Sequence, residues 1–169
     1  LEAGQRILIH GAAGGVGTFA VQLAKWKGAY VIGTASESNI DFLKELGADE
    51  VIDYKKQKFE ELLNNIDVVF DLIGGDTQKK SVQVLKEGGI LVSTLGIVDK
   101  DLLAQHNIKG EAYMAQSIPE QLNQMAALID EGKLKPIIAK IMPLEQAAEA
   151  QKESEAGHVR GKIVLEVRK

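Results

Sequence analysis

The chain has 169 residues, of which 45% are hydrophobic, and 20 basic against 24 acidic residues give a formal net charge of −4. This length fits one globular domain with at most a small appendage, and the mixed charge gives no reason to expect nucleic acid or an anionic membrane as a partner. The sequence contains no cysteine, which excludes disulfides and thiolate metal ligands and is compatible with a cytoplasmic protein.

Predicted strands and helices alternate along the first 131 residues. Short apolar runs predict strands at 6–10, 30–34, 50–53, 66–71, 90–94 and 108–114. Helical spacing of apolar residues predicts helices at 16–27, 39–46, 58–64, 77–85 and 119–131, with Ser38 as the cap of the second. This alternation is typical of an α/β fold, a doubly wound parallel Rossmann sheet with strand order 3-2-1-4-5-6.

The last thirty residues show a different pattern. We predict a strand at 136–141, a helix at 144–154 and a strand at 162–167. We therefore divide the chain into a Rossmann domain, residues 1–136, and a C-terminal segment, residues 137–169. In the helix at 119–131 an apolar stripe is predicted to belong to the core, and it consists of Leu122, Met125, Ala126 and Ile129.

The stretch from Ile7 to Gly17 runs from a predicted strand through a glycine-rich turn into a predicted helix. This arrangement binds a dinucleotide pyrophosphate, because the free N–H groups and the dipole of the helix face the phosphate charge. Gly14 allows the backbone to approach the phosphates, and Gly17 allows helix and strand to pack closely. The motif departs from G-x-G-x-x-G, because Ala12 stands at the first glycine position. The predicted pyrophosphate-binding residues are Ala13, Gly14, Gly15, Val16 and Gly17.

The same stretch, IHGAAGGVGTFAVQLAK, resembles the medium-chain dehydrogenase/reductase superfamily in its quinone-oxidoreductase-like branch. Residues 31–54, 67–75, 85–96 and 157–167 resemble it in the same order. The resemblance implies a GroES-like substrate domain before the cofactor domain, to which the C-terminal segment returns. Since the chain begins nine residues before His10, we expect it to be the cofactor domain of a longer protein, with apolar surface that its absent partner leaves open.

The end of the second strand decides between NAD and NADP, because an acidic residue there binds the ribose and repels a 2′-phosphate. The family pattern places Ala35 at this position. This favours NADPH, and the residues expected at the adenosine end are Thr34, Ser36, Asn39 and Tyr54. The alternative, NADH, rests on Glu37, twenty residues beyond Gly17. Ser36 and Ser38 could also be simple helix caps.

The nicotinamide is expected where the fourth and fifth strands end, beside Gly74, Leu95 and Gly96. Gly74 with Gly75 could equally form only a tight turn. Asp71, at the end of a buried strand, is interpreted as a structural carboxylate rather than a general base. His10 closes the first strand, either near the cofactor or bonded to the backbone.

We predict no catalytic and no metal-ligating residue in this chain, since the nicotinamide itself carries hydride chemistry. The resemblance implies a zinc-independent enzyme that reduces a quinone, enone or related carbonyl compound with NADPH, the isolated domain being inactive. The alternatives are the cofactor domain of a zinc-dependent alcohol dehydrogenase and a non-catalytic NADPH-binding module. Relatives often dimerise through the edge strand, here 108–114, so we expect a homodimer.

Overall fold

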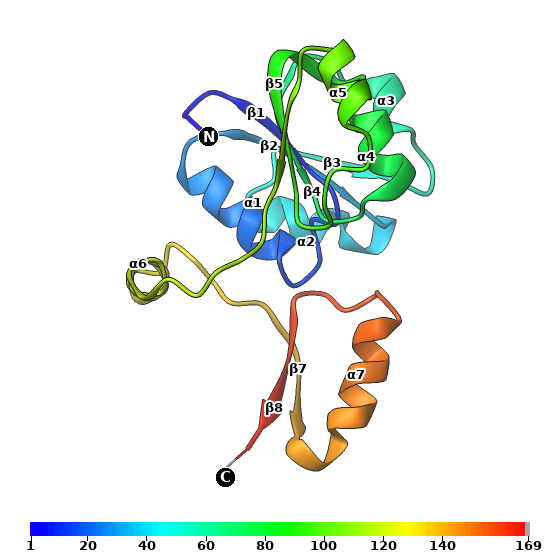
Figure 1. Ribbon diagram of the computed structural model, residues 1–169. Helices are drawn as coiled ribbons and strands as arrows, with labels where there is room; N and C mark the ends of the chain where they lie inside the picture. Colours follow the sequence, from blue (N-terminus) through cyan, green and yellow to red (C-terminus); the bar gives the residue numbers. More distant parts are fainter. Residues whose placement is uncertain (168–169) are drawn as a thin grey trace.

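The computed structural model describes residues 1–167 and contains a six-stranded, wholly parallel sheet with helices on both faces (Figure 1). The strand order is β3-β2-β1-β4-β5-β6, which confirms the predicted fold class and topology. The first half comprises β1 (Arg6–Ile9), α1 (Gly17–Trp26), β2 (Tyr30–Ala35), α2 (Ile40–Glu45), β3 (Glu50–Asp53) and α3 (Phe59–Leu62). The second half comprises β4 (Ile66–Asp71), α4 (Gly75–Ser81), β5 (Leu85–Ser93), α5 (Lys100–Gln105) and β6 (Lys109–Ala112).

Two hydrophobic clusters fill the space between the sheet and its helices. Successive side chains of β1 point to opposite faces, so Leu8 enters one cluster while Ile7 and Ile9 enter the other. The first cluster lies under α3, α4 and α5, and the second lies under α1 and α2, as Figure 1 shows. Burial on both faces explains why the central strands read as continuous apolar runs.

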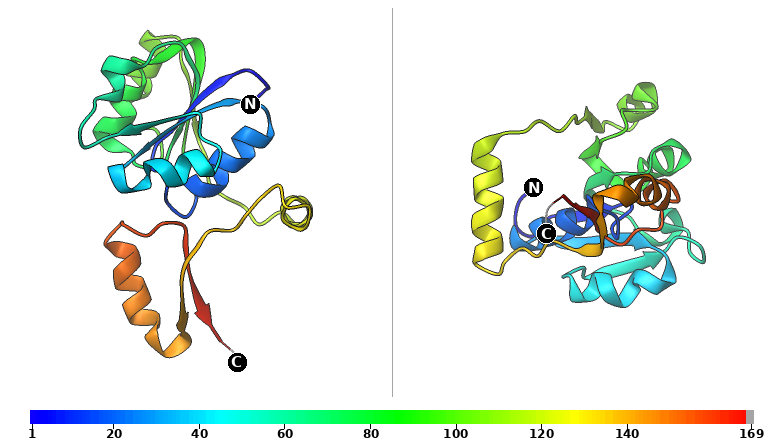
Figure 2. Two further views of the ribbon diagram at one scale, coloured as in Figure 1. Left: turned by 180° about the vertical axis from the view of Figure 1, so that it is seen from behind. Right: turned by 90° about the horizontal axis from the view of Figure 1, so that it is seen from below.

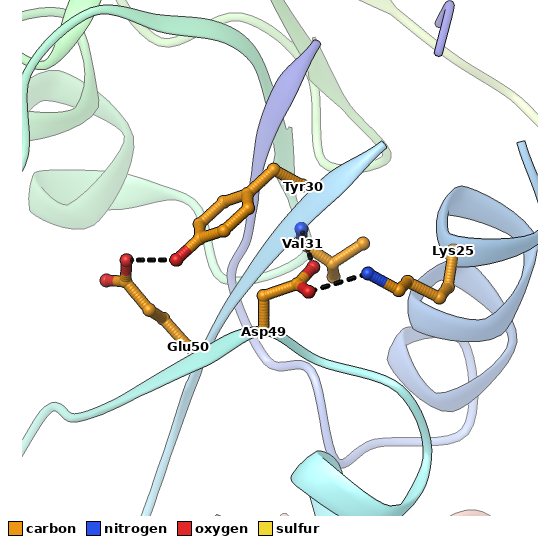
Figure 3. Close-up of polar contacts among 5 residues, drawn as sticks. All are labelled: Lys25, Tyr30, Val31, Asp49 and Glu50. Atoms are coloured by element: carbon orange, nitrogen blue, oxygen red, sulfur yellow. Dashed lines mark hydrogen bonds and ion pairs between the residues drawn. The ribbon is translucent and has the colours of Figure 1, made fainter. Parts of the chain in front are cut away.

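Hydrogen bonds and an ion pair fix the start of β2 against α1 and β3 (Figure 3). The Asp49 carboxylate accepts a bond from the backbone N–H of Val31 at 2.8 Å and pairs with Lys25 Nζ at 2.6 Å. Burial raises the pKa of Asp49, but these two contacts outweigh burial and hold the pKa below its usual value. Tyr30 donates its hydroxyl to Glu50 at 2.6 Å beside them. The amino end of β2 is therefore fixed, and the carboxyl end of the same strand borders the candidate site.

Two parts of the element prediction are wrong. The helix predicted at 77–85 is α4, which ends at Ser81, and β5 begins already at Leu85 rather than at Ile90. The register between β4 and β5 shifts between Ile66 and Val68, and this irregularity takes up residues 86–89, which include Gly88 and Gly89 and lie between the predicted helix and the predicted strand. Helix α5 was not predicted, although Asp99 caps it by accepting from the N–H of Leu102 at 2.8 Å.

The predicted cap of the second helix is also wrong. Ser38 lies inside a single 3₁₀ turn, Glu37–Asn39, and α2 starts at Ile40 without a side-chain cap. The other predicted elements are present, with ends that differ by up to three residues.

The C-terminal part forms a small second unit. Strands β7 (Ile138–Pro143) and β8 (Lys162–Glu166) pair in parallel, and α7 (Ala147–Glu155) connects them beside this two-stranded sheet (Figures 1 and 2). Several apolar side chains of the two strands are exposed, Ile141 by 66%. The domain boundary at residue 136 remains a prediction.

Helix α6 (Pro119–Asp130) stands apart from both units, as the two views of Figure 2 show. The prediction that its apolar stripe belongs to the core is wrong, since none of its residues is buried and Leu122 is 58% exposed. Periodicity identifies an amphipathic helix but does not identify what covers its apolar face. Among the residues that the structure describes, no helix has the length and apolar character needed to cross a membrane.

Candidate functional site

A cleft of about 1260 Å³ opens at the carboxyl ends of β1, β2 and β3. It extends to the end of β4, the neighbour of β1 on the side where the strand order reverses. Ligands of open α/β sheets bind at such a switch point. The lining comes from the glycine-rich turn, the segments that follow β2, β3 and β4, and the C-terminal loop 157–160.

The glycine-rich turn packs directly on β2. Gly11 has a φ of +67° and starts the turn, and the N–H of Ala12 donates to the carbonyl of Thr34 at 3.2 Å. The methyl group of Ala12 is fully buried, and a Cβ at Gly33 would lie only 2.9 Å from it. A glycine on β2 thus makes room for the alanine that replaces the first glycine of the dinucleotide motif.

Gly14, Gly15 and Gly17 have three different surroundings. A Cβ at Gly17 would collide with the backbone of Gly11 and Ala12, so this glycine lets α1 start directly against the turn. A Cβ at Gly14 would meet only the carbonyl oxygen of Gly11, at 3.3 Å. A Cβ at Gly15 would lie 3.0 Å from Lys162 Nζ, which places an ammonium group over the turn.

The start of α1 presents unpaired donors. No side chain caps the helix at Val16, and within residues 1–167 the backbone N–H groups of Gly15, Val16 and Gly17 have no protein acceptor. Three such donors at the positive end of a helix dipole form an anion site. The predicted pyrophosphate-binding residues therefore lie together in a turn that fits a phosphate group.

Polar side chains gather where β2 ends. Asn39 donates from Nδ2 to Ser36 Oγ at 3.1 Å, and Ser36 Oγ lies 3.2 Å from Ser38 Oγ. Ser36 stands at the N-cap position of the 3₁₀ turn Glu37–Asn39, but neither serine makes a side-chain bond that caps a helix. Tyr54 lies in the same part of the cleft, where its N–H donates to the carbonyl of Ala35 at 3.2 Å.

Thr34 differs from the other residues predicted at the adenosine end. Its side chain is buried, and Oγ1 lies 3.0 Å from His10 Nδ1. Nε2 of the same imidazole lies 2.9 Å from Ser81 Oγ. Burial lowers the pKa of His10 to about 4, against the smaller raising effects of Asp71 and Glu60, so the ring is neutral at pH 7. The histidine bonds to side-chain hydroxyls rather than to the backbone, and it forms part of the cleft floor.

The acidic residue that supported NADH is already paired. Glu37 Oε1 lies 2.6 Å from Lys56 Nζ, and both side chains are exposed. Lys56 follows β3, so this pair spans two of the segments that line the cleft. The positive charge of Lys56 compensates the carboxylate that would repel a 2′-phosphate.

The C-terminal loop supplies a site residue that the sequence analysis missed. Arg160 donates from Nε to Asn39 Oδ1 and from Nη2 to the carbonyl of Ser38, both at 2.8 Å. It lines the cleft although 121 residues separate it from Asn39. The available signal was the basic pair Arg160 and Lys162 in a segment with family resemblance, but sequence alone does not bring that segment to the cleft.

Asp71 joins the loops that follow β4 and β5. Its Oδ1 accepts from the N–H groups of Ile73 at 3.0 Å and Gly74 at 2.9 Å, and its Oδ2 accepts from Gln78 Nε2 and Ser93 Oγ, both at 2.8 Å. Burial raises the pKa of Asp71, but these bonds outweigh burial and lower the pKa below its usual value. The interpretation of Asp71 as a structural carboxylate is confirmed.

The residues predicted at the nicotinamide end are neighbours. A Cβ at Gly74 would lie 3.2 Å from Leu95 Cδ1, and Gln78 Nε2 also donates to the carbonyl of Gly96 at 2.9 Å. The cleft lining reaches Leu72 and Ile73, beside this cluster, but does not include it. In the part of the chain that the structure describes, no three His, Asp or Glu side chains could hold a metal ion together.

The sheet order, the switch-point cleft and the uncapped donors define a dinucleotide-binding Rossmann domain. A model of the zinc-binding dehydrogenase family matches residues 46–165, so the chain belongs to that family. This confirms the resemblance to the medium-chain dehydrogenase/reductase superfamily, and the chain corresponds to its cofactor-binding domain.

Known proteins match nearly the whole chain. The human mitochondrial NAD(P)H oxidoreductase RTN4IP1 is 36% identical over 97% of this chain and 48% of its own length. The chloroplastic NADPH-dependent alkenal/one oxidoreductase of Arabidopsis thaliana is 36% identical over 97% of this chain and 41% of its own length. The solved quinone oxidoreductase of Coxiella burnetii has a TM-score of 0.93 and 39% identity over 99% of this chain and 54% of its own. The chain spans about half the length of these proteins.

Proposed function

We propose that this chain is the NADPH-binding domain of a zinc-independent, quinone-oxidoreductase-like enzyme, which transfers hydride from NADPH to a quinone, enone or related carbonyl compound. The observation that carries the proposal is the composition of the cleft. Three backbone N–H groups without a protein acceptor among the described residues lie at the start of α1, and polar and basic side chains lie where β2 and β3 end. The names of the similar alkenal/one and quinone oxidoreductases support the substrate class.

Each part of the cleft has a task in this proposal. The N–H groups of Gly15, Val16 and Gly17 hold the pyrophosphate. Ser36, Asn39 and Tyr54 bind the adenosine end, where the Glu37 carboxylate is paired with Lys56. The nicotinamide lies towards the cluster of Gly74, Leu95 and Gly96. Hydrogen bonds from Gly74 to Asp71 and from Gln78 to Gly96 fix the position of this cluster.

NADPH supplies the hydride when bound, and the protein supplies its position and surroundings. In the proposal the substrate site is completed by the remainder of a longer enzyme, so the isolated chain binds the cofactor and turns over little substrate. The zinc-dependent alcohol dehydrogenase is kept as a second candidate because the matching family model is described as zinc-binding. Zinc analysis of a full-length protein with quinone and alcohol assays decides between them.

Titration of the chain with NADPH and NADH by calorimetry tests the proposal. We expect NADPH to bind at least tenfold more tightly. Tighter binding of NADH would reverse the specificity and point to Glu37, and binding of neither cofactor would contradict a preformed site. A non-catalytic module is indicated if a full-length protein binds NADPH but reduces no carbonyl compound.

We further propose that a second copy of the chain pairs with β6. All four residues of this strand are exposed, and among the described residues no strand pairs with its outer edge. Ile108, in the predicted interface, is instead buried in the core, so a lysine there would test stability rather than assembly. The N–H of Tyr113 donates to Ser93 on β5, so the N–H of Ala112 faces the open edge.

Sedimentation velocity of wild type and Ala112→Pro tests this assembly. The proline removes an outward N–H without removing a bond to β5. We expect a dimer for the wild type and a monomer for the variant, with Ala112→Ser as the control that keeps the N–H. A monomeric wild type, or a variant that remains dimeric, would exclude the β6 interface.

A further inference from the structure

The C-terminal loop between α7 and β8 is fixed against the cofactor cleft by its backbone. The N–H of Gly161 donates to the carbonyl of Ala13 in the glycine-rich turn at 3.0 Å. Gly161 has a φ of +79°, and a Cβ there would collide with Ile137, so the loop needs glycine at this point. The residue before it, Arg160, is thereby held at the cleft, where it is part of the lining.

The guanidinium of Arg160 is oriented by three contacts. It bonds to Asn39 Oδ1 and to the carbonyl of Ser38, and its Cζ lies 4.6 Å from the centre of the Phe42 ring. Stacking on an aromatic ring and bonding through two nitrogens hold the planar group in one orientation. Its orientation is therefore set before a ligand arrives, which reduces the entropy lost on binding.

The charge of Arg160 is not compensated by an acid. No carboxylate of residues 1–167 forms an ion pair with it, and the nearby Glu37 pairs with Lys56 instead. Arginine carries five N–H donors, and the contacts to Ser38 and Asn39 use only part of them. A positive, preoriented fork beside Ser36 and Asn39 has the chemistry that recognises a phosphate monoester.

We infer that Arg160 determines coenzyme specificity by binding the 2′-phosphate of NADPH, so that the C-terminal unit contributes to the cofactor site. This inference rests on the proposed function, since it assumes that the adenosine end lies at Ser36 and Asn39. A role of Arg160 in coenzyme specificity and a purely structural role predict different effects on the affinities for NADPH and NADH. A residue that only holds the loop affects NADPH and NADH alike, because the two cofactors differ only in the 2′-phosphate.

The test compares the affinities of wild type, Arg160→Gln and Arg160→Lys for NADPH, NADH, 2′,5′-ADP and 5′-AMP by calorimetry. We expect Arg160→Gln to weaken NADPH and 2′,5′-ADP about 10- to 100-fold while NADH and 5′-AMP change less than threefold. Arg160→Lys keeps the charge but loses the fork, so it should recover only part of the affinity for NADPH.

Two lysine variants serve as controls. Lys44→Gln removes one charge from α2 outside the cleft and should change no affinity. Lys162→Gln removes the cation beside Gly15 and should weaken both dinucleotides by the same factor, because their pyrophosphates are identical. Thermal unfolding of every variant verifies that the fold is retained.

The outcomes separate this inference from the proposed function. If wild type prefers NADPH and Arg160→Gln keeps that preference, the role of Arg160 is wrong and the proposed function stands. Equal loss of NADPH and NADH in Arg160→Gln also overturns the inference and leaves a structural contact. If wild type prefers NADH or binds neither cofactor, the proposed function fails and the inference fails with it.

Discussion

Replacing Asp71 by asparagine should destabilise the domain more than any single exposed change. The carboxylate accepts four hydrogen bonds, two from the backbone of Ile73 and Gly74 and two from Gln78 and Ser93. Asparagine has the same shape but offers only one acceptor atom. Its NH₂ group must face either the two backbone donors or the two side-chain donors, because each oxygen of Asp71 serves one pair.

The expected loss follows from the two bonds that asparagine cannot make. A hydrogen bond to a charged group contributes about 1.5–3 kcal/mol, so two of them correspond to roughly 3–6 kcal/mol. Asp71 has no exposed surface, so solvent does not compensate for the missing acceptor. Because a domain of this kind has a stability of about 5–15 kcal/mol, the loss is a large share of the total.

Urea unfolding followed by circular dichroism measures this difference. Asp130→Asn, at the exposed end of α6, removes the same charge and should change the free energy of unfolding by less than about 0.5 kcal/mol. The pH dependence gives a second test. The pKa of Asp71 is lower in the fold, so its stabilisation is present above the unfolded pKa of about 3.9 and disappears as pH falls through the folded value.

The gap between wild type and Asp71→Asn should therefore narrow below about pH 4. A loss smaller than about 1 kcal/mol at pH 7, or a gap that stays constant down to pH 2, would refute the reasoning. Either result would mean that solvent or a rearranged Gln78 replaces the lost acceptor.

Three further predictions concern the lining of the cleft. Gly17→Ala should lower the free energy of unfolding in urea by about 1–3 kcal/mol, because its Cβ collides with Gly11 and Ala12. Gly14→Ala should unfold almost as the wild type does, but calorimetry should show weaker binding of both NADPH and NADH. Normal binding by a folded Gly14→Ala would contradict the position of the pyrophosphate. Burial lowers the pKa of His10 from 6.5 to about 4, so its stabilisation is complete above pH 6.5 and declines by about 3 kcal/mol towards pH 4. His10→Gln should remove this decline, and a wild-type stability that stays flat from pH 6.5 to 4.5 would show that the imidazole accepts a proton without cost.

The core of the fold could be predicted because its signals are local. The strand, the glycine-rich turn and the helix that form the pyrophosphate site are consecutive residues, so spacing alone places the donors of Gly15 to Gly17 at the helix start. The strand order was expected because alternating elements that begin with a strand, a glycine-rich turn and a helix are typical of the dinucleotide-binding fold. The bulge at Gly88 and Gly89 escaped prediction, because a glycine pair ends a helix as readily as it bends a strand.

Contacts between residues that are far apart in the chain were decided only by the tertiary structure. His10 bonds to Thr34 and Ser81, and Arg160 reaches Asn39 over 121 residues. The exposure of α6 was also decided only by the tertiary structure. The periodic pattern of its apolar stripe is the same whether or not a neighbouring element covers that stripe. Sequence therefore determined which elements form and how the phosphate turn is built. Packing determined which distant side chains meet there, because a local pattern carries no information about the element that will face it.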